Sequence, residues 1–458
     1  MFFSMPQTVQ REILAGLLVG MVNFLIGFGA TLVAYADPSK NDVAEVESVA
    51  IAGSASLFTA IAGTALFGYL GEKHGRKKSL MTSFVISTIG GAIFFIFKTD
   101  MALYISRAIS GLSAGSRPTV ILYVSETSHA TRRGTVLSSL VMISIFGILL
   151  TYLCQYFLTI QTVAGIAALI SAAGFVGMSF LPETKYWYLT QNNRKKAKES
   201  ILWFDSSKSD EDIEKELNEI KVGKKDGGHT NVFQVLRESH HLKQFLIATF
   251  LFLCRTGCGR EPMATYANDF YAHLGLVFNS RILTLLQAFI EFGVSIVATV
   301  AIGNFKRRTL LYSVVSILIP SLCILLITHN FSTFSNKYVP WLSPAFAIVY
   351  ASSCTAFLFP LVTVVAVEVI SRSNEYRNII YSISYSIMTL SRGIFTAIFP
   401  FLLNGFDMNV TLSVFLISNL LLLMMIKFFV TETANKALHD CAGDNKKEGE
   451  TKTEQSSA

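Results

Sequence analysis

Charged residues are scarce in this 458-residue chain, at 15%, and prolines, cysteines and tryptophans are few, at 10, 6 and 3. The cysteines show no spacing typical of a disulfide framework or a zinc ribbon. No nucleophile elbow, phosphate-binding loop or metal-ligand motif is present, so we predict no enzymatic activity, no cofactor and no bound metal. Hydrophobic residues instead make up 52% of the chain, more than a soluble core can bury, which indicates a membrane protein.

Long apolar runs recur along the chain at a length that suits a bilayer. A helix needs about 20 mostly apolar residues to cross roughly 30 Å of hydrocarbon. Twelve spans are predicted, at residues 13–35, 49–71, 79–97, 101–123, 135–157, 161–181, 245–267, 282–303, 309–328, 341–367, 379–403 and 410–430. The sequence therefore predicts an all-α membrane protein with two bundles of six helices. The expected divisions are an N-terminal bundle at 1–181, a cytoplasmic linker with short helices at 182–244, a C-terminal bundle at 245–430 and a disordered cytoplasmic tail at 431–458.

Basic residues are distributed unequally between the two sides of these spans. With the N-terminus in the cytoplasm, 29 of the 38 Lys and Arg residues fall on cytoplasmic segments, 4 outside and 5 within spans. This asymmetry follows the positive-inside rule, so both termini are predicted to be cytoplasmic, and the net charge of +7 indicates topology and no nucleic-acid partner. The possible glycosylation sites Asn330 and Asn409 fall in loops expected outside.

The loop between the second and third spans carries the first recognisable motif. Residues 68–78 read GYLGEKHGRKK, in which Gly68, Glu72, Gly75 and Arg76 are the signature positions. The glycines allow two helices and a tight turn to approach closely, and the charges lie at the membrane surface. This string resembles the signature loop of the major facilitator superfamily, with Glu72 in place of the usual Asp.

Further strings resemble the sugar porter family within that superfamily. They are YVSETSHATRRG at 123–134, LPET at 181–184 and a helix-like segment at 193–204. Among relatives, the insect facilitated trehalose and glucose transporters look most similar. The resemblance implies the major facilitator fold, with two pseudo-symmetric six-helix bundles, and transport of a sugar by alternating access across the plasma membrane.

Charged residues at the cytoplasmic ends of the spans repeat between the two halves, as in a duplicated six-span unit. The resemblance implies that they pair and close a cytoplasmic gate, each exposed pair contributing at most about 1 kcal/mol. A set of solvated topology charges is the alternative interpretation. The predicted gate charges are Arg76, Glu126, Arg133, Glu183, Arg307, Arg308, Glu368, Arg377 and Glu432.

Ionisable residues inside spans are costly and indicate a functional site. The seventh span reads LFLCRTGCGREPMATYANDFY, whose glycines and Pro262 predict a broken helix lining a cavity. Compared with the sugar porters, Arg255 and Glu261 replace sugar-binding Gln and Asn positions, and Glu291 replaces an Asn of the eighth span. Arg255 and Glu291 both approach the midplane, so we expect them to pair. Arg107 is interpreted as a structural gate residue. The candidate substrate-binding residues are Arg117, Arg255, Glu261, Tyr266, Glu291 and Arg392.

The nature of the substrate remains open between several alternatives. An excess of about two guanidinium groups in the cavity favours an organic anion over a neutral sugar, because guanidinium binds carboxylate bidentately. A fixed internal ion-pair network without a ligand and a non-transporting sensor are the rival interpretations. Proton-linked relatives carry an Asp in the first span, where this chain has Gly27-Phe28-Gly29, which favours facilitated diffusion, although a buried Glu261 or Glu291 could titrate. The expected partners are therefore a small-molecule substrate and the lipid bilayer, with no obligate protein partner.

Overall fold

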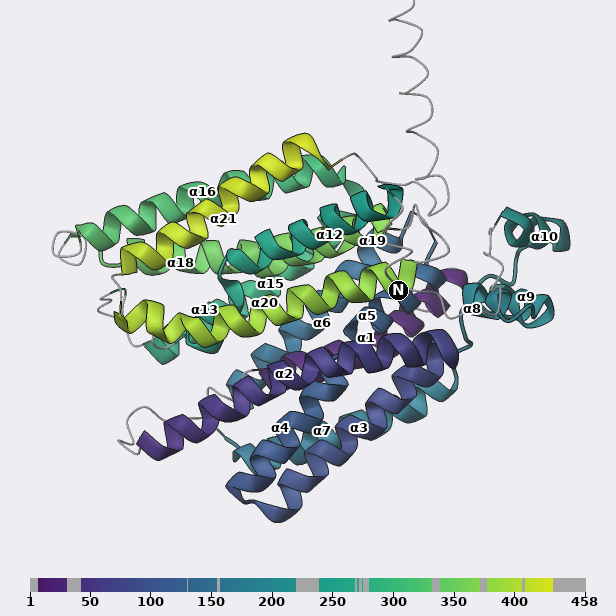
Figure 1. Ribbon diagram of the computed structural model, residues 1–458, viewed down its shortest axis with the longest axis horizontal. Coiled ribbons are helices and arrows are strands. Elements are labelled where there is room, and N and C mark those ends of the chain that lie inside the picture. The colour runs from purple at the N-terminus through teal and green to yellow at the C-terminus, as the bar shows by residue number, and fades with distance from the viewer. Residues whose placement is uncertain are drawn as a thin grey trace, which may run out of the picture.

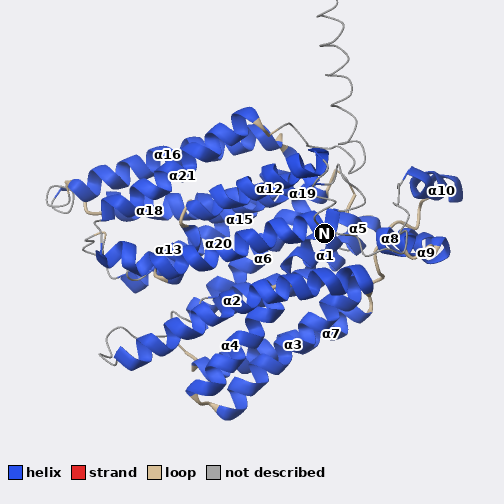
Figure 2. Cartoon of the chain, in the orientation of Figure 1, coloured by secondary structure: helices blue, strands red, loops and turns tan. Residues whose placement is uncertain are grey.

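The protein is helical throughout the part of the chain that the computed structural model describes (Figure 2). The described residues are 7–30, 43–129, 131–154, 157–219, 239–267, 270, 271, 274, 280–331, 338–370, 377–405 and 408–430. The predicted tail at 431–458 and the end of the predicted linker, 220–238, lie outside them.

The first bundle contains six spans, the fourth of which is divided into two helices. Gly115 and Ser116 separate the two, and a Cβ on Gly115 would lie 2.4 Å from the backbone of Gly63, so only a residue without a side chain lets the second span approach this closely. The helices are α1 (Gln7–Ala30), α2 (Val43–Lys73), α3 (Arg76–Phe97), α4 (Asp100–Ala114), α5 (Arg117–Thr127), α6 (Arg133–Cys154) and α7 (Ile160–Ser179).

The second bundle also contains six spans and lies beside the first (Figure 1). Its first span is α12 followed by α13, and its fourth is α18, a π-helical turn η3 and α19. The elements are α12 (Ser239–Gly257), α13 (Arg260–Thr265), α15 (Ser280–Asn304), α16 (Arg307–Asn330), α18 (Leu342–Ser353), η3 (Cys354–Leu358), α19 (Phe359–Ile370), α20 (Arg377–Gly405) and α21 (Met408–Phe428).

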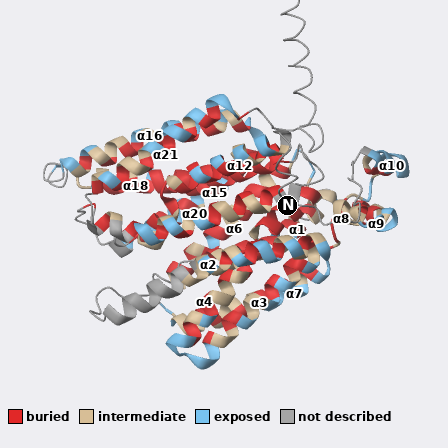
Figure 3. Cartoon of the chain, in the orientation of Figure 1, coloured by how far each residue is buried: buried red, intermediate tan, exposed pale blue. Residues whose placement is uncertain are grey.

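The predicted fold class, twelve spans in two bundles of six, is confirmed. Eight spans of the described chain are long and apolar enough to cross a membrane on their own composition. The span Leu342–Ile370 differs from the others because 94% of its most apolar stretch is buried inside the protein, against 33–50% elsewhere. Figure 3 shows the same contrast, with α19 buried throughout, α18 mostly buried and the peripheral helices exposed on their outer faces. Such outer faces are suited to contact lipid.

The seventh span is broken, as its glycines predict. Helix α12 ends at Gly257, and Gly259 adopts a left-handed conformation with φ of 76° before α13 begins at Arg260. A Cβ on Gly259 would lie 2.0 Å from the ring of Phe415, so both conformation and space require glycine here. The break redirects the chain and determines which side chains of α13 reach the cavity.

Three short helices between the bundles form a separate small unit at one end of the molecule (Figure 1). They are α8 (Lys185–Thr190), α9 (Arg194–Phe204) and α10 (Asp210–Glu219), and the end of the bundles that carries them is called the linker end below. Their core is made of Leu189, Ala197, Ile201, Ile213 and Leu217. The linker helices are thus a folded element, whereas the boundaries predicted for the four divisions of the chain stay predictions.

Candidate functional site

A cavity of about 130 Å³ lies between the two bundles. Helices α1, α2, α4 and α5 line it from the first bundle, and α13 and α20 from the second. This volume is well below the roughly 300–1,000 Å³ of pockets for drug-sized ligands, so the cavity suits a small solute. The hydroxyl groups of the lining residues come from Ser56, Thr64, Ser110, Thr265, Tyr266, Tyr385, Thr389 and Thr396.

Charged side chains converge on the same cavity. Four of the six candidate substrate-binding residues line it: Arg117, Glu261, Tyr266 and Arg392. The Glu261 carboxylate lies 3.4 Å from a guanidinium nitrogen of Arg392, and both side chains remain partly exposed, at 24% and 16%. Arg107, interpreted from the sequence as a structural gate residue, also lines the cavity.

The two other arginines of the cavity, Arg117 and Arg107, donate hydrogen bonds to neutral acceptors in α1 and α6. Arg117 donates from Nε to Asn23 Oδ1 over 3.0 Å and from Nη2 to Ser144 Oγ over 3.2 Å. Arg107 donates from Nη1 to the carbonyl oxygen of Gly29 over 2.7 Å. Within the described residues neither guanidinium has an ion-pair partner, so the lining carries three guanidinium groups against one carboxylate.

The expected pairing of Arg255 with Glu291 is wrong. Glu291 accepts two hydrogen bonds from Nη2 of Arg260, at 2.7 and 2.9 Å, and one from Nε2 of Gln287 at 2.6 Å. Arg255 instead lies over the ring of Phe359, with its Cζ atom 3.9 Å from the ring centroid. The expectation assumed a continuous helix, whereas the break at Gly259 displaces Arg260 from the register of α12 and directs it toward α15. Glu291 is buried and does not line the cavity.

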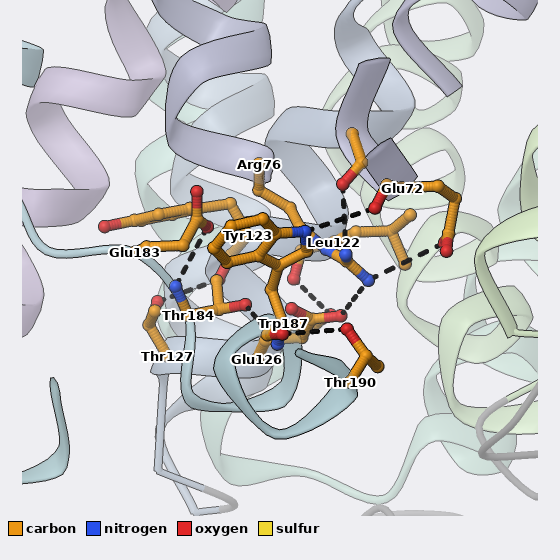
Figure 4. A network of polar contacts seen from close by, with 12 residues as sticks. Glu72, Arg76, Leu122, Tyr123, Glu126, Thr127, Glu183, Thr184, Trp187 and Thr190 are labelled. Atoms are coloured by element: carbon orange, nitrogen blue, oxygen red, sulfur yellow. Dashed lines mark hydrogen bonds and ion pairs between the residues drawn. The ribbon is translucent and has the colours of Figure 1, made fainter. Parts of the chain in front are cut away.

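Two of the predicted gate residues of the first bundle, Arg76 and Glu126, form a network with Glu72 at the linker end (Figure 4). Nη2 of Arg76 lies 3.3 Å from the Glu126 carboxylate and 3.8 Å from that of Glu72, a signature-loop residue. Nη1 of Arg76 also donates to the carbonyl oxygen of Gly71. The indole of Trp187 in α8 donates to the carbonyl oxygen of Glu72, which attaches the linker helices to this network.

We expected Glu183 to pair with an arginine, but its carboxylate binds backbone N–H groups. Its carboxylate accepts hydrogen bonds of 2.9 Å from the backbone N–H groups of Lys77 and Thr184. Gly75 packs directly against it, because a Cβ there would lie 2.2 Å from Glu183 Oε2. Burial raises the pKa of Glu183 to about 7, although these two hydrogen bonds and the nearby Arg76 act in the opposite direction.

One gate contact joins the two bundles. Glu368 of α19 lies 3.2 Å from a guanidinium nitrogen of Arg133 in α6 and 3.9 Å from one of Arg307 in α16. All three side chains are at most 2% exposed, so the expectation of exposed pairs is wrong. Arg307 also packs against Gly134, where a Cβ would lie 2.4 Å from Nη2. The halves are therefore held together at the linker end by desolvated charges.

The remaining gate charges are less central. Arg308 donates to the carbonyl oxygen of Lys427 over 2.9 Å, and its part in the gate stays a prediction. The side chain of Arg377 and all of Glu432 lie outside the described residues.

Two attachments of α1 at the linker end escaped the sequence analysis. Glu12 accepts two hydrogen bonds from Arg132, at 2.7 and 3.0 Å, and Arg11 donates to the carbonyl oxygen of Trp203 in α9 over 2.5 Å. The only signal in the sequence is an Arg-Glu pair directly before the first apolar run.

At the opposite end of the bundles, the two predicted glycosylation sites contact each other. The amide of Asn330 donates to Asn409 over 3.1 Å, and the amide of Asn409 donates back over 3.0 Å. This exchange connects the end of α16 to the start of α21, and modification of either residue stays a prediction. Within the described residues there is no group of three or more potential ligands that could hold a metal ion.

Comparisons with known proteins agree with this architecture. Residues 8–443 match the family model described as "Sugar (and other) transporter". The chain is 23% identical to the facilitated trehalose transporter Tret1 of Bombyx mori, over 94% of this chain and 86% of that protein, and 31% identical to the glucose transporter GlcP of Staphylococcus epidermidis, over 65% and 66%. Its fold matches the proton:xylose symporter XylE with a TM-score of 0.79 at 16% identity, over 95% and 99% of the two chains. The chain therefore belongs to the sugar (and other) transporter family, and it has the fold of a solved major facilitator superfamily structure.

Proposed function

We propose that this protein moves a small hydroxylated solute of the sugar class across a membrane by alternating access, without coupling to protons. The observation that carries the proposal is the cavity of about 130 Å³ between the bundles, lined by eight hydroxyl-bearing residues and closed at the linker end by the contact of Glu368 with Arg133 and Arg307. The names of the relatives, which are trehalose and glucose transporters, support the same class of solute.

The gate contact is suited to opening and closing. Removing one partner of a buried ion pair leaves an uncompensated charge and costs about 3–5 kcal/mol, whereas hydrating all partners together costs much less. Separation of the bundles at the linker end admits water to Glu368 and both arginines at once. The bundles can then rock about the central cavity on the microsecond to millisecond timescale of domain motions.

The contact of Arg107 supports facilitated diffusion. In the first span its acceptor is the backbone carbonyl of Gly29, which does not titrate. A carboxylate at this point would change charge with a proton, and none is present among the described residues of α1 that line the cavity. The fold is shared with a proton:xylose symporter. The acceptor of Arg107 that does not titrate therefore supports transport without proton coupling on the same fold.

The orientation belongs to the same proposal. Basic residues are concentrated at the linker end, so we place that end and both termini in the cytoplasm, and the membrane as the plasma membrane. The residues proposed to meet the solute are Arg117, Glu261, Tyr266 and Arg392. An organic anion is the second candidate, because guanidinium groups outnumber carboxylates in the lining.

Uptake into vesicles tests the proposal. Purified protein is reconstituted into liposomes, and entry of labelled D-glucose and trehalose is measured against L-glucose and empty liposomes. We expect saturable, stereoselective uptake that is unchanged when an imposed pH gradient is collapsed. Loss of uptake on collapse would overturn the facilitated mechanism, and the absence of flux and of ligand-induced thermal stabilisation from a folded preparation would favour the sensor.

A further inference from the structure

We propose that the solute carries a carboxylate as well as hydroxyl groups, as a sugar acid of monosaccharide size does, and that Arg117 and Arg392 bind this carboxylate. The inference rests on the proposed function, since it names the substrate class of the same cavity. It is carried by the charges and by the chemistry of the lining.

The lining of the cavity has an excess of cations. Arg107, Arg117 and Arg392 face it, and Glu261 is the single carboxylate among its described lining residues. Arg255 lies close enough to Glu261 to interact electrostatically with it, whereas Arg260 already has Glu291 as a partner. Cations that are largely removed from water and lack a matching carboxylate carry a cost, because an unpaired buried charge is strongly destabilising. An anionic solute removes this cost when it enters.

The arrangement of the guanidinium groups suits a carboxylate. Arg117 is held from the side of the first bundle by Asn23 and Ser144, two neutral acceptors that orient its planar group without neutralising it. Arg392 comes from the second bundle, and its only described ion pair is the partly exposed one with Glu261 at 3.4 Å. Its Nε atom is buried and has no hydrogen-bond partner among the described residues. Guanidinium presents parallel N–H groups that match both oxygens of a carboxylate.

Glu261 acts as an exchangeable counterion in this arrangement. In the empty cavity its carboxylate pairs with Arg392, and the carboxylate of the solute takes its place when the solute is bound. Because Arg117 and Arg392 belong to different bundles, an anion between them draws the halves together around it. The hydroxyl groups of Ser110 and Thr396 remain available for the hydroxyls of the solute, and Thr389, which donates to the carbonyl oxygen of Tyr385, can accept a hydrogen bond from it.

The amino-acid types that line the cavity agree with this assignment. Neutral sugars are commonly held by side-chain amides, which donate and accept at once. The described lining of the cavity contains no Asn, Gln or Trp, and its donors are hydroxyl and guanidinium groups. Guanidinium donates only, so it matches the pure acceptor of a carboxylate better than the mixed donor and acceptor of a hydroxyl.

The experiment compares two solutes that differ at one carbon. D-glucose and D-glucuronate, each labelled, are offered to proteoliposomes containing the full chain, with the membrane potential set by potassium and valinomycin. We expect saturable glucuronate uptake that exceeds glucose uptake at equal concentration and that rises when the interior is made positive, because an anion carries its charge inward. Arg117→Gln and Arg392→Gln should each lower glucuronate uptake roughly tenfold or more, since each removes a charge-assisted pair.

Matched controls separate the possible outcomes. Arg194→Gln removes an exposed arginine of α9 that lies outside the cavity, and it should leave uptake unchanged. Each variant is also tested for thermal stabilisation by glucuronate, which reports binding if a variant is folded but inactive. Saturable glucose uptake that glucuronate neither shares nor inhibits would overturn the carboxylate assignment and leave the proposed function standing. Glucuronate uptake that both arginine variants retain would also overturn it, and a folded protein that neither binds nor moves either solute would overturn both proposals.

Discussion

The gate at the linker end and the central cavity both contain arginine and glutamate side chains, but in different proportions. In the gate, Arg76 is matched by Glu126 and Glu72, and Glu368 is shared by Arg133 and Arg307, so that cations and carboxylates balance. The cavity lining sets three guanidinium groups against one carboxylate. Balanced charges in the gate stabilise the closed arrangement of the protein itself. The excess positive charge of the cavity is instead suited to binding an anionic ligand. The four predictions below test this difference.

The largest effect is expected from Glu368→Gln in the gate. The variant leaves two arginines desolvated without their carboxylate, so the state closed at the linker end should lose about 3–5 kcal/mol. Ser138 lies in α6 one turn beyond Gly134 and is 2% exposed, so a Ser138→Cys thiol reports opening. A maleimide is added at the linker side, and labelling of the protein without Ser138→Cys is subtracted as background. The introduced thiol should then react faster in the Glu368→Gln variant than in the protein with Glu368. Equal labelling rates in both backgrounds would show that Glu368 does not hold the gate.

Glu183 should make the stability of the linker end depend on pH. Its pKa of about 7 in the folded protein lies above the ordinary value of 4.5, so the folded state binds the proton more tightly than the unfolded state. The resulting stabilisation is fully present below pH 4.5 and is lost as the pH rises through 7, with a total on the order of 3 kcal/mol. The melting temperature of the wild type should therefore fall between pH 5 and 8 relative to that of Glu183→Gln. Parallel curves for the two proteins would contradict this assignment.

Arg117→Gln should separate stability from transport in the cavity. The substitution loses two hydrogen bonds to neutral acceptors but relieves repulsion among guanidinium groups, so we expect a change in the free energy of unfolding of less than about 1 kcal/mol. Arg133→Gln in the gate provides the comparison and should be several times more destabilising. Equal losses of thermal stability would remove the distinction between gate and cavity.

The smallest effect is expected from Glu214→Gln in the linker helices. Its ion pair with Arg194 has a distance of 2.8 Å, but both side chains are more than half exposed. Such surface pairs contribute about 0–1 kcal/mol. Melting temperature and uptake should stay within experimental error of the wild type, and a clear loss would show that the linker helices contribute to the gate beyond the Trp187 contact.

Much of the fold and part of the site could be predicted from local patterns. Hydrophobic runs predict the spans because a helix in lipid must satisfy its own backbone, whatever it packs against. The break at Gly259 was predictable since glycine and proline act on their own segment. The partner of Glu291 was not, because the break at Cys258 and Gly259 changes which arginine of the seventh span faces α15. The hydrogen bond from the backbone of Lys77 to Glu183 and the pairing of Glu12 with Arg132 were likewise beyond the sequence, since each joins segments more than 100 residues apart.

The sequence by itself determined that the chain crosses a membrane in two related sets of six helices, and it named most of the charged side chains of the gate and cavity. The spans follow from composition and local spacing, which act over a few turns of helix, and the gate residues follow from the resemblance to a known family. Only the tertiary structure decided which charges meet and which remain unmatched. The physical reason is that a charge in a dry interior depends on the few groups within several ångströms of it, and those groups are brought there by the packing of distant helices.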